Sequence, residues 1–383
     1  MGKLRVLHCY KTYYPVTFGG IEQVIFQLSE AMNTDEVEST VFCVNNSEDS
    51  GLEPFHNHYV FRTKKDFEIA STPFSFKAFK QFKELVKSFD IVHYHFPYPF
   101  MDMLHFASKV NKPSVVSYHS DIIKQKKLMG LYNPLMKRFL KSVDRIVTAS
   151  PNYLNSSKVL QNYKDKVSIV PYGIPDITKS KSDADVNNEI TKQFPNGYFL
   201  FVGSFRYYKG LHYLLEAMKD SNIPIVLLGA NGEEDSLKKF VKEHNMTNIN
   251  FVGAKDDSIK YSYLAKAVGF VFPSHLRSEA FGISLVEAAC FGLPLISCEI
   301  GTGTTFINTN DQTGIVIDGA NPEQLKRAVY NIWNDRSKSS EYGKRARERY
   351  EEIFTAKKMA SEYLDIYEEV IFQHKNRQFY ITR

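Results

Sequence analysis

An alternation of two kinds of segment runs along almost the whole chain and constrains the fold more than any other feature. Short runs of apolar and β-branched residues alternate with longer amphipathic stretches, which is the pattern of parallel strands covered by helices. Strands are expected at residues 5–9, 39–44, 91–95, 114–118, 145–149 and 167–170, and again at 198–202, 225–228, 249–252, 269–272, 294–297 and 314–317. Helices are expected at 22–32, 76–87, 134–142, 151–160, 211–217, 235–243, 261–265, 283–290, 322–333 and 338–373.

The alternation is interrupted over residues 176–189, which are rich in Asp, Ser, Lys and Asn and have the composition of a linker or an exposed loop. A chain of 383 residues is also too long for one core of ordinary size. We therefore expect an α/β protein with two Rossmann-like, doubly wound domains that face a central cleft. The expected divisions are an N-terminal domain at 1–175, a linker at 176–195, a C-terminal domain at 196–355, and a C-terminal helix at 356–383 that returns toward the N-terminal domain.

The composition is that of an ordinary globular protein, with 43% hydrophobic and 24% charged residues. No apolar run approaches the ~18 residues of a membrane span, and the N-terminus lacks the apolar core of a signal peptide. The cysteines form no CxxC pair, which favours buried free thiols in a reducing compartment: Cys9, Cys43, Cys290 and Cys298. The expected location is therefore the cytoplasm.

The net charge of +5 is modest, but several cations gather between residues 122 and 141 among Leu, Met, Tyr and Phe. Such a segment suits a peripheral contact with an anionic membrane, here the inner face of the plasma membrane, and it suits an ordinary amphipathic surface helix equally well. Nucleic acid is not an expected partner, because no zinc finger, RNA-binding sheet signature or similar module accompanies these cations.

The strongest chemical signal is the stretch SHLRSEAFGISLVEA at 274–288, where a strand has ended and a helix is expected to begin near Ile283. Unsatisfied N–H groups at a helix amino terminus form a ready site for a diphosphate, and Gly282 lets a phosphate approach the backbone closely. Glu279 lies before this helix and Glu287 inside it, so one carboxylate can contact a sugar while the other accepts hydrogen bonds from ribose hydroxyls. Taken alone, Glu279 would be better explained as a carboxylate stabilised by the helix dipole, but the whole stretch favours the functional interpretation.

This stretch resembles the E-x7-E motif of the retaining glycosyltransferases of family 4, which have the GT-B fold. Upstream, FVGSFRYYKGL at 201–211 resembles the family's donor-phosphate loop, in which Lys209 and Arg206 would neutralise the diphosphate leaving group. Family members often have Arg directly after the first glycine, whereas this chain has Ser204, so the arginine role is carried to Arg206 as in relatives with an RYYKG loop. Without the other motifs, both cations would be interpreted as solvated loop charges.

Further matches extend the resemblance over the full length. Gly19-Gly20 resembles the N-terminal glycine loop that lies against the donor phosphates, and His119 resembles the strand-end histidine that contacts the donor sugar, here at its C6 hydroxyl. The resemblance implies an acceptor-binding N-terminal domain and a C-terminal domain that binds the nucleotide-sugar. It implies catalytic roles for His119, Glu279, Lys209 and Arg206, and donor binding by Gly19, Gly20, Gly203, Gly210, Gly229, Ala254, Phe281, Gly282, Ile283 and Glu287.

The segment EIGTGTT at 299–305 resembles a narrower group, the mannosyltransferases of bacterial surface-polysaccharide (O-antigen) assembly. This implies GDP-mannose as the donor and a lipid-linked oligosaccharide as the acceptor, with UDP-glucose, UDP-galactose or UDP-N-acetylglucosamine as alternative donors. No DxD-like acidic pair follows a strand in a place suited to Mg²⁺, so we expect neither a metal nor any other cofactor.

Two other classes of protein remain as alternatives. An NAD-linked dehydrogenase would need G-x-G-x-x-G directly after a strand and an acidic residue about 20 residues later, and the chain has no full match. A sugar-binding scaffold without catalysis is the non-enzymatic alternative, and the presence of Lys209, Glu279 and Glu287 argues against it.

Overall fold

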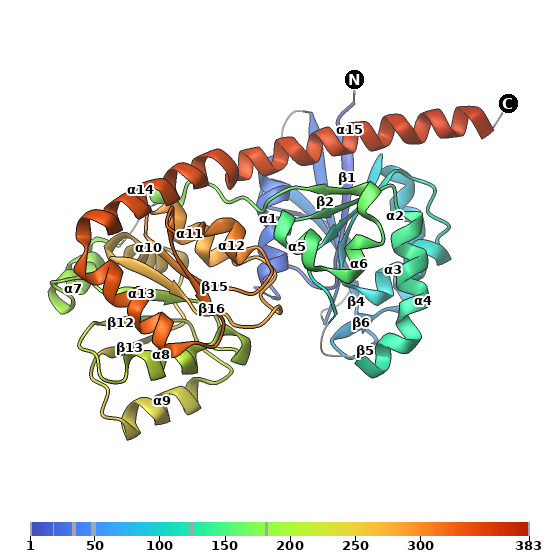
Figure 1. The fold of residues 1–383 in the computed structure, drawn as a ribbon. Helices are drawn as coiled ribbons and strands as arrows, with labels where there is room; N and C mark the ends of the chain where they lie inside the picture. The colour runs from blue at the N-terminus through green and yellow to red at the C-terminus, as the bar shows by residue number, and fades with distance from the viewer. Residues whose placement is uncertain are drawn as a thin grey trace. The chain divides into compact units, whose positions relative to one another are not determined.

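The computed structural model describes residues 2–17, 19–32, 36–46, 51–122, 126–180 and 183–381. The chain forms two compact units (Figure 1). Unit 1 contains Met1–Gly173 together with Ala356–Arg383, and unit 2 contains Ile174–Thr355. The C-terminal segment therefore belongs to the same unit as the N-terminus.

Unit 1 is built on an eight-stranded sheet in the order β10-β9-β8-β7-β1-β2-β4-β3, in which only the β3–β4 pair is antiparallel. A separate two-stranded hairpin, β5–β6, follows β4. The strands are β1 (Leu4–Cys9), β2 (Val37–Asn45), β3 (Gly51–Phe55), β4 (His58–Lys64), β5 (Phe67–Ile69), β6 (Thr72–Phe74), β7 (Ile91–Phe96), β8 (Ser114–Tyr118), β9 (Arg145–Thr148) and β10 (Val167–Ile169).

Helices flank this sheet, and several begin at side-chain caps: Ser75, Ser150 and Ser157 each accept a hydrogen bond from a backbone N–H three residues later. The longest, α15, packs against α1. The helices are α1 (Gly20–Met32), α2 (Phe76–Leu85), α3 (Pro99–Ala107), α4 (Lys126–Ser142), α5 (Pro151–Ser156), α6 (Lys158–Gln161) and α15 (Ala356–Ile381), with 3₁₀ turns at Val86–Ser88 and Lys164–Lys166.

Unit 2 has a wholly parallel six-stranded sheet in the order β13-β12-β11-β14-β15-β16. Its central strands are buried at every residue, as expected for a sheet covered on both faces. The strands are β11 (Phe199–Val202), β12 (Ile225–Leu228), β13 (Ile249–Gly253), β14 (Gly269–Phe272), β15 (Leu295–Glu299) and β16 (Gly314–Asp318). The helical segments are η3 (Ile177–Lys179), α7 (Ala184–Gln193), η4 (Tyr207–Lys209), α8 (Leu211–Met218), α9 (Glu234–Glu243), α10 (Asp257–Lys266), α11 (Ile283–Cys290), α12 (Thr304–Ile307), α13 (Pro322–Asn334) and α14 (Arg336–Ile353).

The expected α/β class, with two Rossmann-like parallel sheets, is confirmed, and every expected strand is present with ends within two residues of the expected ones. Several local expectations are wrong. The helix expected over 151–160 is two helices, α5 and α6, which meet at Ser157. Part of the expected linker is a helix, α7, which starts at the Asp183 cap and packs against α10. The helix expected from residue 134 begins at Lys126 and contains Pro134. The helix expected over 338–373 is two helices, α14 and α15, which belong to different units.

In each sheet the order of the strands reverses once relative to the chain. In unit 1, β2 lies on one side of β1 and β7 lies on the other; in unit 2, β12 and β14 flank β11 in the same way. Open α/β sheets bind ligands outside the carboxyl ends of the strands at such a topological switch point. The topology therefore predicts a ligand site after β1 and β7 in unit 1, and another after β11 and β14 in unit 2.

None of the helices that the structure describes is long and apolar enough to cross a lipid bilayer.

Candidate functional site

The two motif-bearing loops of unit 2 leave the two strands at its switch point. Residues 203–210 follow β11 and residues 273–282 follow β14, and these strands are neighbours in the sheet. The loops are in contact, since the backbone N–H of His275 donates to the carbonyl of Tyr208 at 3.0 Å. The topology thus brings the RYYKG loop and the first half of the E-x7-E stretch together.

A buried ion pair joins these loops. The Nζ of Lys209 donates to Oε2 of Glu279 at 2.5 Å, and the Ser274 hydroxyl donates to the same oxygen at 3.2 Å. The side chains of Lys209 and Glu279 are 10% and 11% exposed, and the ammonium lies 4.6 Å from the centre of the Phe272 ring. An ion pair that is nearly removed from water is costly to break unless another charge replaces the lost partner.

Glycines allow the loops of this site to approach each other closely. A Cβ on Gly229 would lie 1.9 Å from the carbonyl oxygen of Gly203, and a Cβ on Gly210 would lie 2.1 Å from that of Pro273. Both distances are far below van der Waals contact, so no other residue fits without a backbone shift. The structure therefore brings the expected donor glycines, Gly203, Gly210 and Gly229, together with Lys209.

Helix α11 begins where the loop after β14 ends, as the sequence predicts. The helix begins at Ile283 directly after Gly282, which has a left-handed conformation with φ of 101°. The preceding Phe281 is 3% exposed, so its ring anchors the turn in the core of unit 2. The first N–H groups of this helix have no carbonyl partner within the helix and lie at the positive end of its dipole.

The segment 299–305 lies against the E-x7-E stretch. The backbone N–H of Gly303 donates to the carbonyl of Ala280 at 3.0 Å, and the Arg277 guanidinium donates to the carbonyl of Gly301 at 3.1 Å. Glu299 closes the segment on itself, accepting from the Gly301 N–H at 2.7 Å and from the Thr305 hydroxyl at 2.9 Å. The motif that favoured a mannosyl donor is thus a neighbour of the diphosphate motif.

Glu287 has a partner that the sequence analysis did not identify. Its Oε1 accepts from Nζ of Lys260 at 2.8 Å, and Asp257 lies 2.8 Å from the same nitrogen. Burial of Lys260 favours the neutral amine, but the carboxylates of Glu287 and Asp257 outweigh it and raise the pKa of Lys260 above its usual value. Lys260 has no motif around it, and only the packing of α10 near α11 reveals its role.

Two expected site residues lie at the surface of unit 2. The Arg206 side chain is exposed and makes no ion pair within the described part of the chain. Ala254 is also exposed and follows the last residue of β13. Neither residue is tied to the buried pair.

In unit 1, Gly19 and Gly20 stand at the start of α1, and His119 directly follows β8. His119 is 4% exposed, and both of its ring nitrogens have partners: the Tyr172 hydroxyl lies 2.5 Å from Nδ1, and Nδ1 of His95 lies 3.0 Å from Nε2. Burial lowers the pKa of His119 to about 3. It is therefore a neutral imidazole held within unit 1.

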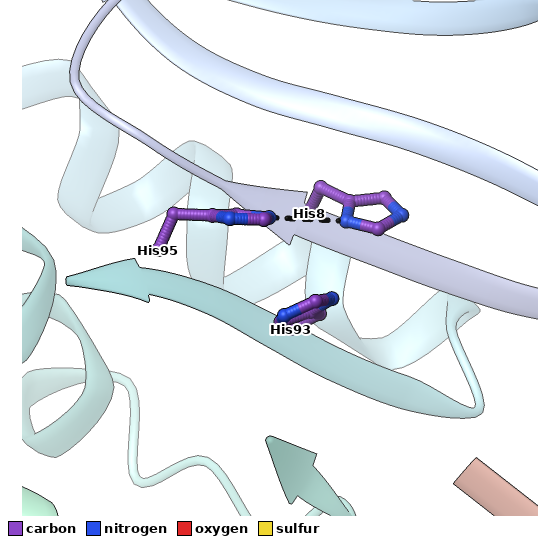
Figure 2. A group of neighbouring side chains, drawn as sticks. All are labelled: His8, His93 and His95. Atoms are coloured by element: carbon purple, nitrogen blue, oxygen red, sulfur yellow. Dashed lines mark hydrogen bonds between the residues drawn. The ribbon is translucent and has the colours of Figure 1, made fainter. Parts of the chain in front are cut away.

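His119 is one end of a larger cluster of buried histidines. Figure 2 shows His8 on β1 beside His93 and His95 on β7, with the hydrogen bond of 3.2 Å between Nδ1 of His8 and Nε2 of His95. Ligand atoms of these three side chains lie within 4.8 Å of one another. Burial lowers the pKa of His8 to about 3 and that of His93 and His95 well below the usual value, with smaller contributions from neighbouring histidines.

The nitrogens of this cluster are largely engaged with protein groups. Those of His93 lie 2.6 Å from the Tyr367 hydroxyl of α15 and 2.7 Å from the Ser117 hydroxyl. Of the ring nitrogens of His8, His93, His95 and His119, only Nε2 of His8 is buried without a hydrogen-bond partner. The cluster therefore acts as a polar core that ties α15 to the sheet of unit 1.

Two family models match this chain, one in each half. A model for "Glycosyl transferases group 1" matches residues 185–349, and a model for "Glycosyltransferase Family 4" matches residues 18–176. The chain is 47% identical to O-antigen chain mannosyltransferase C of Escherichia coli over 95% of this chain and 98% of that protein. It is 46% identical to a D-rhamnosyltransferase of Pseudomonas aeruginosa over 92% and 93% of the two chains.

Among solved structures, sucrose-phosphate synthase of Thermosynechococcus elongatus superimposes with a TM-score of 0.78 at 20% identity, covering 97% of this chain and all of that one.

Proposed function

The chain belongs to the family 4 glycosyltransferases, and from that membership we propose that it transfers mannose from GDP-mannose to a lipid-linked oligosaccharide of O-antigen type, with retention of the anomeric configuration. Enzymes of this family use nucleotide-sugar donors. The mannosyl donor is supported by the 47% identity to a mannosyltransferase and by the segment 299–305.

The observation that carries the proposal is the Lys209–Glu279 pair at the switch point of unit 2. A diphosphate bound there would take over the ammonium of Lys209 as it gains negative charge, and Glu279 would then accept hydrogen bonds from hydroxyls of the donor sugar. Preorganised cations and N–H groups stabilise the charge that develops on a leaving group. Arg206, which is exposed and unpaired within the described part of the chain, would complete the neutralisation together with the amino end of α11.

The nucleoside part of the donor is assigned to the Glu287 side of α11. Lys260 holds one oxygen of the Glu287 carboxylate, and the ribose hydroxyls would donate to this carboxylate. Ala254, at the end of β13, would offer backbone groups to the base. When backbone groups contact a base, the side chains of the sequence give few clues to which base is bound. UDP-sugars therefore remain the alternative donors.

The proton of the acceptor hydroxyl would pass to an oxygen of the departing phosphate, so the reaction needs no protein base. It would need no metal either, because the cations and the helix terminus supply the positive charge.

A D-rhamnosyl donor is the second candidate, and two observations favour it. The chain is almost as similar to a D-rhamnosyltransferase as to the mannosyltransferase. D-Rhamnose is mannose without the C6 hydroxyl, and both nitrogens of His119, the residue expected to contact that hydroxyl, already have protein partners.

The acceptor is assigned to unit 1, with a membrane contact through residues 122–141. Residues 123–125 of this segment lie outside the described residues. On α4, Leu131 is 84% exposed and Lys137, Arg138 and Lys141 are exposed, while the opposite face is buried. An exposed apolar residue beside cations suits an anionic lipid surface, and sedimentation with anionic vesicles, compared with a Leu131→Ser variant, tests this contact.

A thermal-shift panel followed by transfer assays tests the donor. A ligand that binds only the folded state raises the melting temperature, so GDP-mannose is expected to raise it more than UDP-glucose, UDP-galactose or UDP-N-acetylglucosamine. Release of GDP with transfer to a lipid-linked acceptor is then expected. A larger shift with a UDP-sugar, or transfer of D-rhamnose and not mannose, would overturn the mannosyl assignment.

A further inference from the structure

The connection from β1 to α1 leaves the switch point of unit 1, the counterpart of the place where unit 2 holds its buried ion pair. Its described residues are 10–17 and Gly19, which we call the β1–α1 connection. The resemblance to family 4 implies a role here only for Gly19 and Gly20, in donor binding. The structure adds a carboxylate, that of Glu22.

Glu22 lies in the first turn of α1 and is 6% exposed. Its Oε1 accepts two hydrogen bonds, from the hydroxyl of Thr12 at 2.8 Å and from that of Thr17 at 2.8 Å. Thr12 and Thr17 lie near opposite ends of the β1–α1 connection, so a single oxygen atom holds both. A carboxylate in the first turn is further stabilised by the helix dipole.

Gly19 is the third point of this arrangement. A Cβ on Gly19 would lie 2.3 Å from Oε2 of Glu22 and 3.1 Å from its carboxyl carbon. The carboxylate therefore rests directly on the backbone of Gly19, and a side chain at this position would displace it. This gives the first glycine of the Gly-Gly pair a steric role toward Glu22.

The middle of the connection is anchored separately. Tyr13 is buried, and its hydroxyl lies 3.0 Å from Nε2 of His58. The Arg62 guanidinium donates to the carbonyl of Tyr14 at 2.6 Å. Pro15 and Val16 are left exposed at the tip, with 48% of Val16 accessible. Backbone hydrogen bonds also hold Lys11 to Val44 and Thr17 to Tyr13. The connection thus has one defined shape, and Glu22 adds side-chain hydrogen bonds near both of its ends.

The two switch points also differ in charge. In unit 2, the loops present Lys209 and the free amino end of α11. In unit 1, the Glu22 carboxylate occupies the amino end of α1 and offsets its positive dipole, and the imidazoles of His8 and His95 are neutral because burial lowers their pKa. A diphosphate is favoured in the first environment, whereas a neutral ligand rich in hydroxyls suits the second.

We propose that Glu22 is a positioning residue for the acceptor sugar: through Thr12, Thr17 and Gly19 it holds the β1–α1 connection in the shape against which the acceptor binds. The inference rests on the proposed glycosyl transfer. A surface that is ordered before binding spares the acceptor the entropy of ordering it. Loss of Glu22 therefore weakens acceptor binding more than donor binding, because among the expected donor-binding residues only Gly19 and Gly20 adjoin this connection and the others lie in unit 2.

The experiment compares Glu22→Ala, Glu22→Gln and Thr12→Val/Thr17→Val with a control on the same turn, Gln23→Ala. Acceptor KM and kcat are measured at saturating donor, and hydrolysis of the donor by water is measured without acceptor. Hydrogen exchange of peptides covering residues 10–17 is followed in each purified protein without ligands.

Glu22→Ala and the double threonine variant are expected to raise the acceptor KM about tenfold to a hundredfold, which corresponds to about 1.4–2.8 kcal/mol of acceptor binding free energy. Donor hydrolysis is expected to fall by less than about threefold, because the donor contacts that lie in unit 2, Lys209 among them, are unchanged. Exchange of 10–17 should accelerate in both variants. Glu22→Gln is expected to rescue both readouts, since its amide oxygen still accepts from both hydroxyls, and Gln23→Ala should change neither.

Unchanged exchange in Glu22→Ala, or equal losses of donor hydrolysis and transfer, would overturn the inference. If Glu22→Ala does not fold, the double threonine variant decides, because it removes only two hydroxyls. Failure of the proposed function has a different appearance: the unmodified enzyme would transfer no sugar from any nucleotide-sugar, while exchange of 10–17 would still separate Glu22→Ala from Glu22→Gln.

Discussion

Lys209 and Glu279 are 70 residues apart in the chain, yet the ammonium of one lies 2.5 Å from the carboxylate of the other in the interior of unit 2. Each side chain is the hydrogen-bonding partner of the other in a place with little water. The pair places side by side a cation, Lys209, that can stabilise a leaving diphosphate and a carboxylate, Glu279, that can accept hydrogen bonds from sugar hydroxyls.

This relationship makes stability and activity separable. Lys209→Ala leaves the Glu279 carboxylate buried without its partner, and is expected to cost about 3–5 kcal/mol of unfolding free energy. It should also lower the rate of donor turnover about 10²–10³-fold, the usual effect of removing one preorganised donor of positive charge. Urea unfolding and single-turnover assays measure the two quantities.

The double variant Lys209→Ala/Glu279→Ala is the informative comparison, since it should regain much of the lost stability and remain inactive. Lys238→Ala, which breaks an exposed pair with Glu234, is the matched control and should change stability by less than about 1 kcal/mol. Near-native turnover in the double variant would contradict the assigned role.

Arg206 offers a test without a folding penalty. Because its side chain is exposed and makes no ion pair within the described residues, Arg206→Ala should leave the melting temperature unchanged. If Arg206 contacts the donor diphosphate, kcat/KM for the donor should fall about tenfold or more, as expected for loss of a charge-assisted hydrogen bond. Arg327→Ala, another exposed arginine of unit 2, should have no effect. Unaltered kinetics in Arg206→Ala would remove this residue from the site.

The close approach of Gly229 to Gly203 predicts a large steric effect. Gly229→Ala places a methyl group 1.9 Å from the Gly203 carbonyl, so the β11 loop that carries Lys209 must shift. We expect a loss of several kcal/mol of stability, in the range of ~3–5 kcal/mol seen for severe backbone and packing clashes, and weaker donor binding. Gly130→Ala on α4, where no atom lies within 4 Å of the added carbon, is the control and should be neutral or slightly stabilising. Equal melting temperatures for the two variants would contradict the prediction.

The buried histidines of unit 1 predict an acid-sensitive fold. Burial lowers the pKa of His8 and His119 from 6.5 to about 3, so below pH 6.5 the unfolded chain binds protons that the folded chain does not. Stability is therefore complete above this pH and falls as the pH drops toward 3, by about 1.4 kcal/mol per pH unit for each such histidine. Burial raises the pKa of the Asp102 carboxyl, so the folded chain holds a proton there that the unfolded chain releases. This proton cancels the effect of one histidine on the pH dependence of stability.

Urea unfolding between pH 7 and pH 5 measures this slope. We expect the free energy of unfolding to fall by more than about 2 kcal/mol per pH unit near the acid end of this range. Four buried histidines with a lowered pKa, His8, His93, His95 and His119, each take up a proton on unfolding, and Asp102 offsets only one of these protons. His119→Gln should reduce this slope by about 1.4 kcal/mol per pH unit, the contribution of one proton. A free energy that is flat over this range would show that the histidines are protonated in the folded state.

Transfer is expected to withstand metal removal. The positive charge at the proposed diphosphate site comes from Lys209, Arg206 and the amino end of α11. Overnight dialysis against EDTA should therefore leave kcat unchanged, with a metal-dependent glycosyltransferase treated in parallel as the control. Loss of activity that Mg²⁺ or Mn²⁺ restores would overturn the proposal.

The sequence by itself determined the α/β class, the parallel strands and the sites of its motif loops, because these depend on local periodicity and on which residues stop a strand. The run of apolar residues at Phe199–Val202 and the Gly282–Ile283 helix start are both local signals of this kind. Residues 51–74 were missed as strands, since their short, mixed runs carry little period, and α7 was missed because its cap at Asp183 lies in a segment with a linker's composition.

Only the tertiary structure decided which side chains meet. Lys260 reaches Glu287, His95 reaches His119, and Thr12 and Thr17 share one oxygen of Glu22. No spacing in the chain encodes these partners. They follow from strand order and helix packing, which bring distant loops to one edge of a sheet. They follow also from burial, because a buried polar group without a hydrogen-bond partner costs free energy.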